Sequence, residues 1–323
     1  MPARISVLTL SFIDDRIKKQ CVFSCVYILY CVFVRGCNLH TLSVLLVLAS
    51  GITHAVWNIV TKQSDNKQLF LWIIFLPSTI LLMPWFLEEV TREGLPLQAY
   101  LLILLSMLIQ AAYANFLAKS LTYGDMSQVY PMMRGISTFL LPLISILFLN
   151  ETLTGWGWVG LLCIATGFIA TSGLAFRRQR KAIPTKVILY TVGVGLSTMS
   201  YILVDKINLL HLSPIALLTA SNIGFMLGLV PHIKFSQVNW LKLIKQNGVI
   251  LAVGSILSPG SYLLFLLAMS LSPLTFVAPL REIGTVFGTV AGIYFLKEKK
   301  ETVRIVSAAI IFIGIVLIGI WGK

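Results

Sequence analysis

The chain contains one stretch twice, as LAKSLTYGDMSQVYPMMRG at residues 117–135 and as LAMSLSPLTFVAPLREIG at residues 267–284. The likeness continues further along, since Phe148-Leu-Asn-Glu151 matches Phe295-Leu-Lys-Glu298 and Ala165-Thr-Gly167 matches Phe312-Ile-Gly314. Both copies belong to long apolar stretches. We therefore expect a set of membrane helices that is duplicated within one polypeptide, and membrane proteins built in this way usually bind a small molecule between their halves.

The composition indicates that most of the chain faces lipid. Apolar residues make up 57% of the 323 residues, charged residues make up 11%, and the mean hydropathy is +0.90, whereas a soluble domain carries about 25% charge. Apolar runs near the spanning length of about 20 residues predict an all-α polytopic membrane protein with ten transmembrane helices, because the runs are too continuous for a barrel. The runs lie at residues 41–61, 69–87, 97–118, 128–149, 155–175, 187–206, 213–232, 248–269, 274–296 and 303–321.

The net charge of +13 indicates membrane topology rather than binding of nucleic acid. Fifteen Lys and Arg residues fall in the connections after the first, third, fifth, seventh and ninth runs, whereas only Arg92 and Lys206 fall in the others. The positive-inside rule places the richly basic connections in the cytoplasm. Both ends of a ten-helix bundle then face outward.

The two halves are predicted to be inverted repeats of five helices each. Gly51, Trp57 and Lys62 of the first run match residues 144 positions later, namely Gly195, Tyr201 and Lys206. Because each half holds an odd number of spans, the second half enters the membrane in the opposite sense. The predicted parts are residues 41–176, a basic linker at 177–186, and residues 187–323.

Residues 1–40 form a separate N-terminal extension. They hold Cys21, Cys25, Cys31 and Cys37, and the apolar run from Cys21 to Val34 is short for a span. One interpretation is an extra short span that brings the N-terminus inside. A signal peptide is disfavoured, because no small-residue cleavage site follows the apolar run. The favoured hypothesis is that residues 1–38 are not part of the mature protein and that translation starts near Leu39.

The runs at 128–149 and 274–296 carry a shared motif, in which a proline stands three residues before a charged position and Phe-Leu-x-Glu follows at the end. Together with the opening stretch SGITHAVWNIVTKQSDN at residues 50–66, the duplicated layout resembles the drug/metabolite transporter superfamily, EamA type. The resemblance covers residues 39–321. It implies export or exchange of small metabolites by secondary transport, with the fourth and ninth helices lining a central cavity.

Three of the candidate site residues are charged residues within the predicted spans, where each costs about 2.5–3.5 kcal/mol at the bilayer centre. Arg134 lies two turns into the fourth run, and both Arg281 and Glu282 lie at the matching depth of the ninth. In one interpretation an arginine binds an anionic group of the substrate, while Glu282 neutralises the other arginine or carries a proton. The alternatives are a structural Arg134–Glu282 ion pair and snorkelling of these groups to the lipid headgroups.

Several polar and aromatic side chains are candidates for the same substrate site. His54 and Asn58 lie on one face of the first helix with Trp57 beside them, and His54 is a proton-coupling candidate together with Glu282, since histidine titrates near pH 6.5. Helix packing is the alternative role for each. The further candidates are aromatic: Tyr130 before Pro131, Tyr201 as the counterpart of Trp57, and Tyr262 after Pro259-Gly260.

The sequence predicts no cofactor, no metal and no enzymatic activity. It contains no phosphate-binding loop of the Gly-x-x-x-x-Gly-Lys-Ser/Thr type and no metal-ligand motif. We expect a multi-pass protein of the cell membrane, of the bacterial cytoplasmic type, whose partners are the lipid bilayer and an anionic or zwitterionic metabolite, with a homodimer compatible with this layout. The alternative function is an integral membrane enzyme that acts on a lipid-linked substrate, which needs acidic or histidine clusters at the membrane surface.

Overall fold

The computed structural model describes residues 39–62, 66–92, 94–124, 126–172, 184–235, 238, 240–294 and 302–322. The chain divides into two compact units, Met1–Leu42 and Ser43–Lys323, and the second unit holds the helical bundle. Three expectations lie outside the described residues: the nature of residues 1–38, the motif at 295–298 and most of the basic linker.

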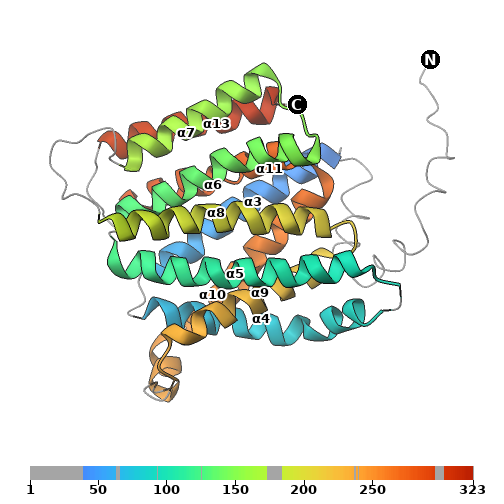
Figure 1. The fold of residues 1–323 in the computed structure, drawn as a ribbon. Helices are drawn as coiled ribbons and strands as arrows, with labels where there is room; N and C mark the ends of the chain where they lie inside the picture. Colours follow the sequence, from blue (N-terminus) through green and yellow to red (C-terminus); the bar gives the residue numbers. More distant parts are fainter. Residues whose placement is uncertain are drawn as a thin grey trace. The chain divides into compact units, whose positions relative to one another are not determined.

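The described residues are helical, without strands (Figure 1). The helices are α3 (Leu39–Lys62), α4 (Lys67–Val90), α5 (Leu97–Tyr123), α6 (Met126–Leu149), α7 (Gly155–Ser172), α8 (Thr185–Asn208), α9 (Pro214–Leu229) with the 3₁₀ turn η2 (Val230–His232), α10 (Trp240–Leu271), α11 (Leu274–Leu280), α12 (Ile283–Tyr294) and α13 (Thr302–Trp321). The described residues of each apolar run thus lie mainly on helix.

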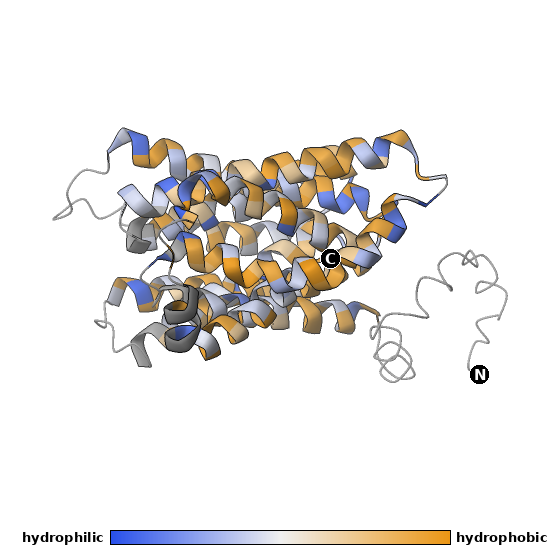
Figure 2. Ribbon diagram, turned by 90° about the horizontal axis from the view of Figure 1, so that it is seen from below, coloured by the Kyte–Doolittle hydropathy of each residue, from blue (hydrophilic) through white to orange (hydrophobic). Residues whose placement is uncertain are grey.

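Eight of the described helices are long and apolar enough to cross a membrane, and α7 is a shorter apolar helix. Apolar side chains lie on the outside of the bundle as well as inside it, as Val249 and Ile256 of α10 illustrate with 78% and 72% of their surface exposed. Figure 2 shows hydrophobic residues along the middle of the helices and hydrophilic ones mostly towards their ends. A bundle with such a surface suits a lipid environment.

The ninth apolar run, predicted as one span over 274–296, is broken into α11 and α12. Pro279 has no amide hydrogen to donate to the carbonyl one turn back, and its ring crowds that carbonyl. After it the backbone tightens: the amides of Glu282 and Gly284 donate to carbonyls three residues back, on Pro279 and Arg281. The break therefore falls at Arg281 and Glu282, the two charged residues of the run.

The helices pack in a pattern that occurs twice. Helix α5 packs on α9 and α10 packs on α4, while α6 packs on α7 and α12 packs on α13. Three further contacts join counterparts directly, namely α4 with α9, α6 with α11, and α7 with α13. Figure 1 shows α7 and α13 side by side at one edge of the bundle. The contacts thus relate the two halves of the chain in the order expected from the repeat.

Two pairs of glycines allow helices to approach closely. A Cβ atom on Gly284 of α12 would lie 2.3 Å from the carbonyl oxygen of Gly51 in α3, and one on Gly51 would lie 2.6 Å from the carbonyl oxygen of Arg281. Gly160 of α7 and Gly314 of α13 make a second such contact. Small residues at helix crossings are typical of membrane bundles, where close packing replaces the hydrophobic effect.

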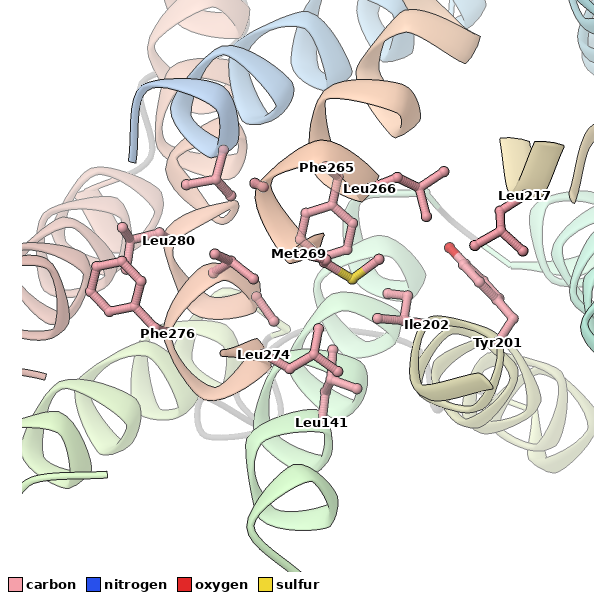
Figure 3. Packing of buried hydrophobic residues seen from close by; sticks show 14 of the residues in the cluster. Leu141, Tyr201, Ile202, Leu217, Phe265, Leu266, Met269, Leu274, Phe276 and Leu280 are labelled. Carbon is pink, nitrogen blue, oxygen red and sulfur yellow. The ribbon is translucent and has the colours of Figure 1, made fainter. Parts of the chain in front are cut away.

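The largest apolar core lies where α6, α8, α10 and α11 meet (Figure 3). Phe265 and Met269 of α10 and Phe276 of α11 are buried there, against Leu141 of α6. Every residue of α11 is buried. This core holds the broken helix in the middle of the bundle and so fixes the position of Arg281 and Glu282.

Two glutamates from the ends of helices bind the starts of helices in the other half of the chain. The carboxylate of Glu151, just after α6, accepts hydrogen bonds from the amides of Leu274 and Thr275, both at 2.8 Å. Glu89 of α4 accepts from the amide and hydroxyl of Ser213, which precedes α9. Carboxylates suit helix starts, since the first amides have no partner within the helix.

Candidate functional site

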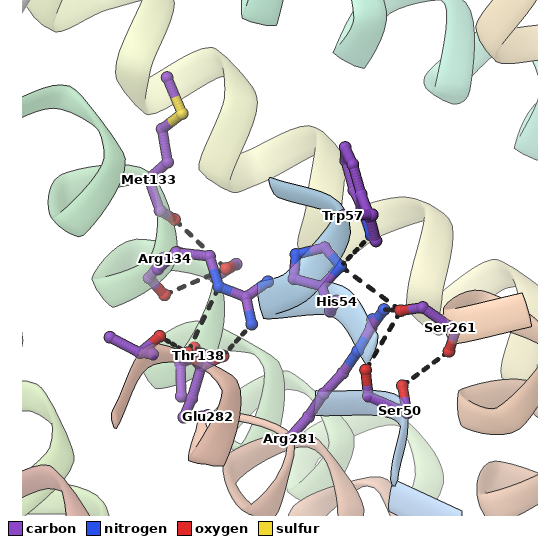
Figure 4. A network of polar contacts seen from close by, with 11 residues as sticks. Ser50, His54, Trp57, Met133, Arg134, Thr138, Ser261, Arg281 and Glu282 are labelled. Atoms are coloured by element: carbon purple, nitrogen blue, oxygen red, sulfur yellow. Dashed lines mark hydrogen bonds and ion pairs between the residues drawn. The ribbon is translucent and has the colours of Figure 1, made fainter. Parts of the chain in front are cut away.

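Arg134 of α6 and Glu282 form a buried ion pair (Figure 4). The guanidinium donates from Nη2 to Oε1 at 2.5 Å and from Nε to Oε2 at 3.3 Å. The same carboxylate accepts from the hydroxyls of Thr138 at 2.8 Å and Thr285 at 2.9 Å. With four donors, the Glu282 carboxylate is fully satisfied, and its charge balances that of Arg134.

Arg281 points to the opposite side of the break from Glu282 (Figure 4). Its guanidinium lies 4.3 Å over the ring of Phe265 and 5.8 Å from the ring of Tyr262, and Nη2 donates to the Ser261 hydroxyl at 3.4 Å. The residue is 6% exposed, and its Nε is buried with no hydrogen-bond partner. Among the described residues no carboxylate lies within ion-pair distance of Arg281, and the Glu282 carboxylate acts on this cation only from further away.

His54 and Trp57 of α3 stand beside Arg281. The indole Nε1 of Trp57 donates to Nδ1 of His54 at 3.2 Å, and the hydroxyl of Ser261 lies 3.5 Å from the same nitrogen. Two hydrogen bonds join α3 and α10 at this level. The hydroxyl of Ser50 donates to the carbonyl oxygen of Ser261 at 2.7 Å, and the hydroxyl of Ser261 donates to the carbonyl oxygen of Ser50 at 3.2 Å. The imidazole thus lies at the crossing of α3 and α10.

Three tyrosines from different helices stack edge to face next to this cluster. The ring of Tyr201 in α8 lies 5.7 Å from Tyr113 of α5 and 5.8 Å from Tyr262 of α10. The row of rings continues from Tyr262 to Phe265, and the Arg281 guanidinium packs over the Phe265 ring. Rings arranged in this way present one apolar wall with several hydroxyl groups.

The structure brings seven of the nine candidate residues together: Arg134, Arg281, Glu282, His54, Trp57, Tyr201 and Tyr262. Tyr130 is half-buried in α6, one turn before Arg134, and its hydroxyl is close enough to be influenced by the charges of Arg134 and Glu282. The backbone of Asn58 lies in α3, but its side chain is outside the described part of the structure.

The charged groups also interact with the imidazole. Both Arg281 and Arg134 act electrostatically on His54, and the two guanidinium groups act on each other. Two cations, one carboxylate and one imidazole therefore share the centre of the bundle. Within the described ranges no group of three or more His, Cys, Asp or Glu side chains lies together as metal ligands would.

Sequence reasoning missed one buried carboxylate. Asp205 of α8 is completely buried and accepts hydrogen bonds from hydroxyls on three other helices. It falls inside the predicted span 187–206, so the rule that intramembrane charges are candidate functional groups applied to it. Asp205 lies at the end of that span, directly before Lys206.

Equivalent positions of the two halves meet directly in the bundle. Arg134 and Glu282, which are 148 positions apart, form the ion pair. Ser78 of α4 accepts a hydrogen bond at 3.1 Å from Asn222 of α9, 144 positions later, which is also the spacing of Gly51 and Gly195. Both contacts join the first half of the chain to the second.

Comparison with known proteins agrees with this duplication. A family model described as the EamA-like transporter family matches residues 41–173 and again residues 185–320. One similar solved structure, titled "Crystal structure of protein", aligns with a TM-score of 0.67 and 14% sequence identity over 86% of this chain and 95% of the other. At that identity the likeness concerns the fold alone. No curated protein sequence matches the chain significantly.

The family match spans most of the chain, falls once on each half, and includes the helices that carry Arg134, Arg281 and Glu282. Apolar helices long enough to span a bilayer, combined with this match, make the chain a multi-pass membrane protein of a family of small-molecule transporters. The chain belongs to the EamA-like transporter family.

Proposed function

We propose that the protein is a secondary transporter, an exporter or exchanger, of a small anionic or zwitterionic metabolite in the cell membrane. The observation that carries this proposal is Arg281, a buried guanidinium whose Nε lacks a hydrogen-bond partner and which forms no ion pair with any described residue. Leaving such a group unpaired in lipid is costly. A carboxylate or phosphate of a substrate would satisfy it through two parallel hydrogen bonds.

The residues around Arg281 determine the charge and the polarity of the proposed site. The Arg134–Glu282 pair is already balanced, so it adds no net charge and leaves Arg281 as the anion-binding group. Tyr201 and Tyr262 supply an aromatic wall, and His54 supplies an imidazole beside the arginine. These groups together suit a ligand that has one anionic end and a small polar or apolar body.

We infer ten spans arranged as two inverted halves around this site. Helix α7, with 18 residues, is about 27 Å long at 1.5 Å per residue, and α11 with α12 supplies the ninth crossing. The domains are residues 41–176 and 187–323. Broken helices near the midplane recur in transporters with inverted repeats, where they bind the substrate and allow one half to rock against the other.

Counterflow in proteoliposomes tests the transport proposal. Vesicles containing the purified protein are loaded with one unlabelled metabolite, and entry of the same labelled compound is measured for a panel of amino acids and small organic acids. We expect the wild type to exchange a compound with a carboxylate, and Arg281→Gln to abolish that exchange. Arg281→Lys should not restore it, because a single ammonium cannot replace the planar fork or its position over Phe265.

A matched control separates loss of the site from loss of a positive charge. Arg92 is an exposed arginine after α4, so Arg92→Gln removes the same charge outside the spans and should transport as the wild type does. Transport by a folded Arg281→Gln protein at the wild-type rate would overturn the assignment of the site. If the wild type exchanged nothing in the panel but altered a lipid-linked compound, the enzyme alternative would replace the transporter.

A further inference from the structure

A second buried anionic site lies apart from the Arg134–Glu282 pair. Asp205 accepts from the hydroxyl of Ser106 at 2.5 Å on Oδ1, and on Oδ2 from Tyr262 at 2.5 Å and Ser221 at 3.2 Å. The donors come from α5, α10 and α9, while Asp205 itself lies in α8. Four helices therefore converge on one carboxylate that is completely buried.

No cation accounts for this carboxylate in the part of the chain that the structure describes. The next residue, Lys206, turns away and donates to the carbonyl oxygens of Met269 and Ser272 at the end of α10. Arg134 on α6, which packs on α8, is paired with Glu282. The titratable groups that face Asp205 are Tyr262 from α10 and Tyr201 one turn earlier on its own helix, while α5 and α9 present serine hydroxyls.

Hydroxyl groups are a suitable environment for a carboxyl group that gains and loses a proton. A hydroxyl donates to the charged form and, after rotation, accepts from the neutral form. An arginine or lysine partner would instead favour the ionised form. A metal ion is a poorer occupant, since one carboxylate and three hydroxyls that all donate to it leave few free lone pairs for a cation.

Asp205 is linked directly to the proposed substrate site through Tyr262. The ring of Tyr262 lies between the two, with its hydroxyl bonded to Asp205 and the Arg281 guanidinium 5.8 Å from its centroid. When Asp205 takes up a proton, its new O–H must donate, so one of the three hydroxyls must turn from donor to acceptor. If that hydroxyl belongs to Tyr262, the change reaches the ring that packs beside Arg281.

We propose that Asp205 is the proton-binding site that couples transport to a proton gradient. One proton from the water on one side of the membrane adds to a carboxylate oxygen, and the same proton leaves to the other side after the halves have rocked. The proposal rests on the proposed function for its role in transport, but the protonation itself does not. His54 is less suited, because its protonation adds a third positive charge beside Arg134 and Arg281.

Isotope-edited infrared spectroscopy tests protonation without any substrate. The five aspartates of the chain are Asp14, Asp15, Asp65, Asp125 and Asp205, and only Asp205 lies within a described span. Protein carrying isotope-labelled aspartate is titrated with acid in liposomes. We expect a label-sensitive band of a buried protonated carboxyl group that Asp205→Asn removes and Glu282→Gln retains. Absence of the band from the folded wild type, or its persistence in Asp205→Asn, overturns the proposal.

Transport measurements give the second, independent readout. With a metabolite that the wild type exchanges, a proton gradient opposed to the solute should accelerate uptake, and Asp205→Asn should lose this acceleration while Asp205→Glu retains it. Tyr262→Phe, which keeps the ring and removes one donor to the carboxylate, should shift the pH of half-maximal uptake upward. Acceleration that survives in folded Asp205→Asn, or that follows a sodium gradient instead, overturns the proposal.

The two proposals fail in different ways. If no metabolite of the panel is exchanged, the transport proposal fails, and the infrared band still decides whether Asp205 binds a proton. If exchange occurs and depends on Arg281, but the band is absent, only the coupling role of Asp205 fails. If Asp205→Asn misfolds, the label-sensitive band must disappear in Asp205→Glu, and its frequency and pH dependence must move in Tyr262→Phe, if Asp205 is the site.

Discussion

Arg134 and Glu282 occupy equivalent positions of the two halves and bind each other through two hydrogen bonds, at 2.5 and 3.3 Å. The contact joins α6 to the break between α11 and α12, so it ties the first half of the chain to the one place in the second half where a span is interrupted. A pair at this position is able both to stabilise the bundle and to set the charge of the central site.

We predict that breaking this pair destabilises the protein more than exchanging its charges. Arg134→Met and Glu282→Gln each leave one buried charge unpaired, which costs about 3–5 kcal/mol, whereas the double variant Arg134→Glu with Glu282→Arg restores a pair. Thermal unfolding in detergent measures the three proteins. The single variants Arg134→Glu and Glu282→Arg complete the comparison, and a charge-exchanged protein no more stable than the sum of their effects predicts would show that the pair contributes no mutual stabilisation.

Glycine substitutions should separate the close helix crossing from general helix stability. Gly284→Ala introduces a Cβ atom 2.3 Å from a backbone oxygen of Gly51, which forces α3 and α12 apart at a cost of about 1–3 kcal/mol. Gly288→Ala, one turn along α12, meets only the Cβ atom of Ala55 at 3.9 Å and should stabilise the helix by about 0.5–1 kcal/mol. Unfolding midpoints that rank the two variants the other way would contradict the observed crossing.

The carboxylate of Glu151 should protect the start of α11. Glu151→Ala leaves the buried amides of Leu274 and Thr275 without acceptors, at a cost of about 1–3 kcal/mol for each unsatisfied group. We expect faster hydrogen exchange at these two amides. Glu88→Ala, which removes an exposed carboxylate at the end of α4, is the control and should leave their exchange unchanged.

Substitution of His54 should reveal whether the imidazole matters as a hydrogen-bond acceptor. His54→Gln retains an acceptor for the Trp57 indole, whereas His54→Leu removes this hydrogen bond, at a cost of about 0.5–1.5 kcal/mol. We expect the glutamine variant to unfold at nearly the wild-type temperature and the leucine variant to unfold earlier. Equal midpoints would mean that the indole bond contributes nothing.

The sequence was sufficient to locate the central charges because the duplication supplied the alignment. Offsets of 147 and 148 positions both bring Arg134 onto the charged pair of the ninth run, and the structure places Arg134 against Glu282. The length and apolar character of the runs predicted the helices. The number of spans and their inverted sense stay predictions, since eight described helices meet the length and composition of a span.

Other features needed the structure, for identifiable reasons. Proline is tolerated in membrane helices, so Pro279 alone did not predict the break that follows it, and nothing in a single sequence says that Arg281 and Glu282 point in opposite directions. The repeated Phe-Leu-x-Glu motif was visible, but the contact of Glu151 with the start of α11 depends on how the halves pack. Asp205 lay within the reach of sequence reasoning, yet its three donors come from distant segments.

The contacts between equivalent residues have a consequence for how such a chain evolved. Had a doubled gene kept its two copies identical, position 134 would face another arginine, and two guanidinium groups at that distance repel each other. Divergence was therefore required at the Arg134–Glu282 contact, whereas the Ser78–Asn222 contact could also be made by two identical residues that both donate and accept hydrogen bonds. In an ancestor made of two identical chains, each of these positions would have contacted the same residue of the other chain, so it would have needed a residue that can bind an identical copy of itself.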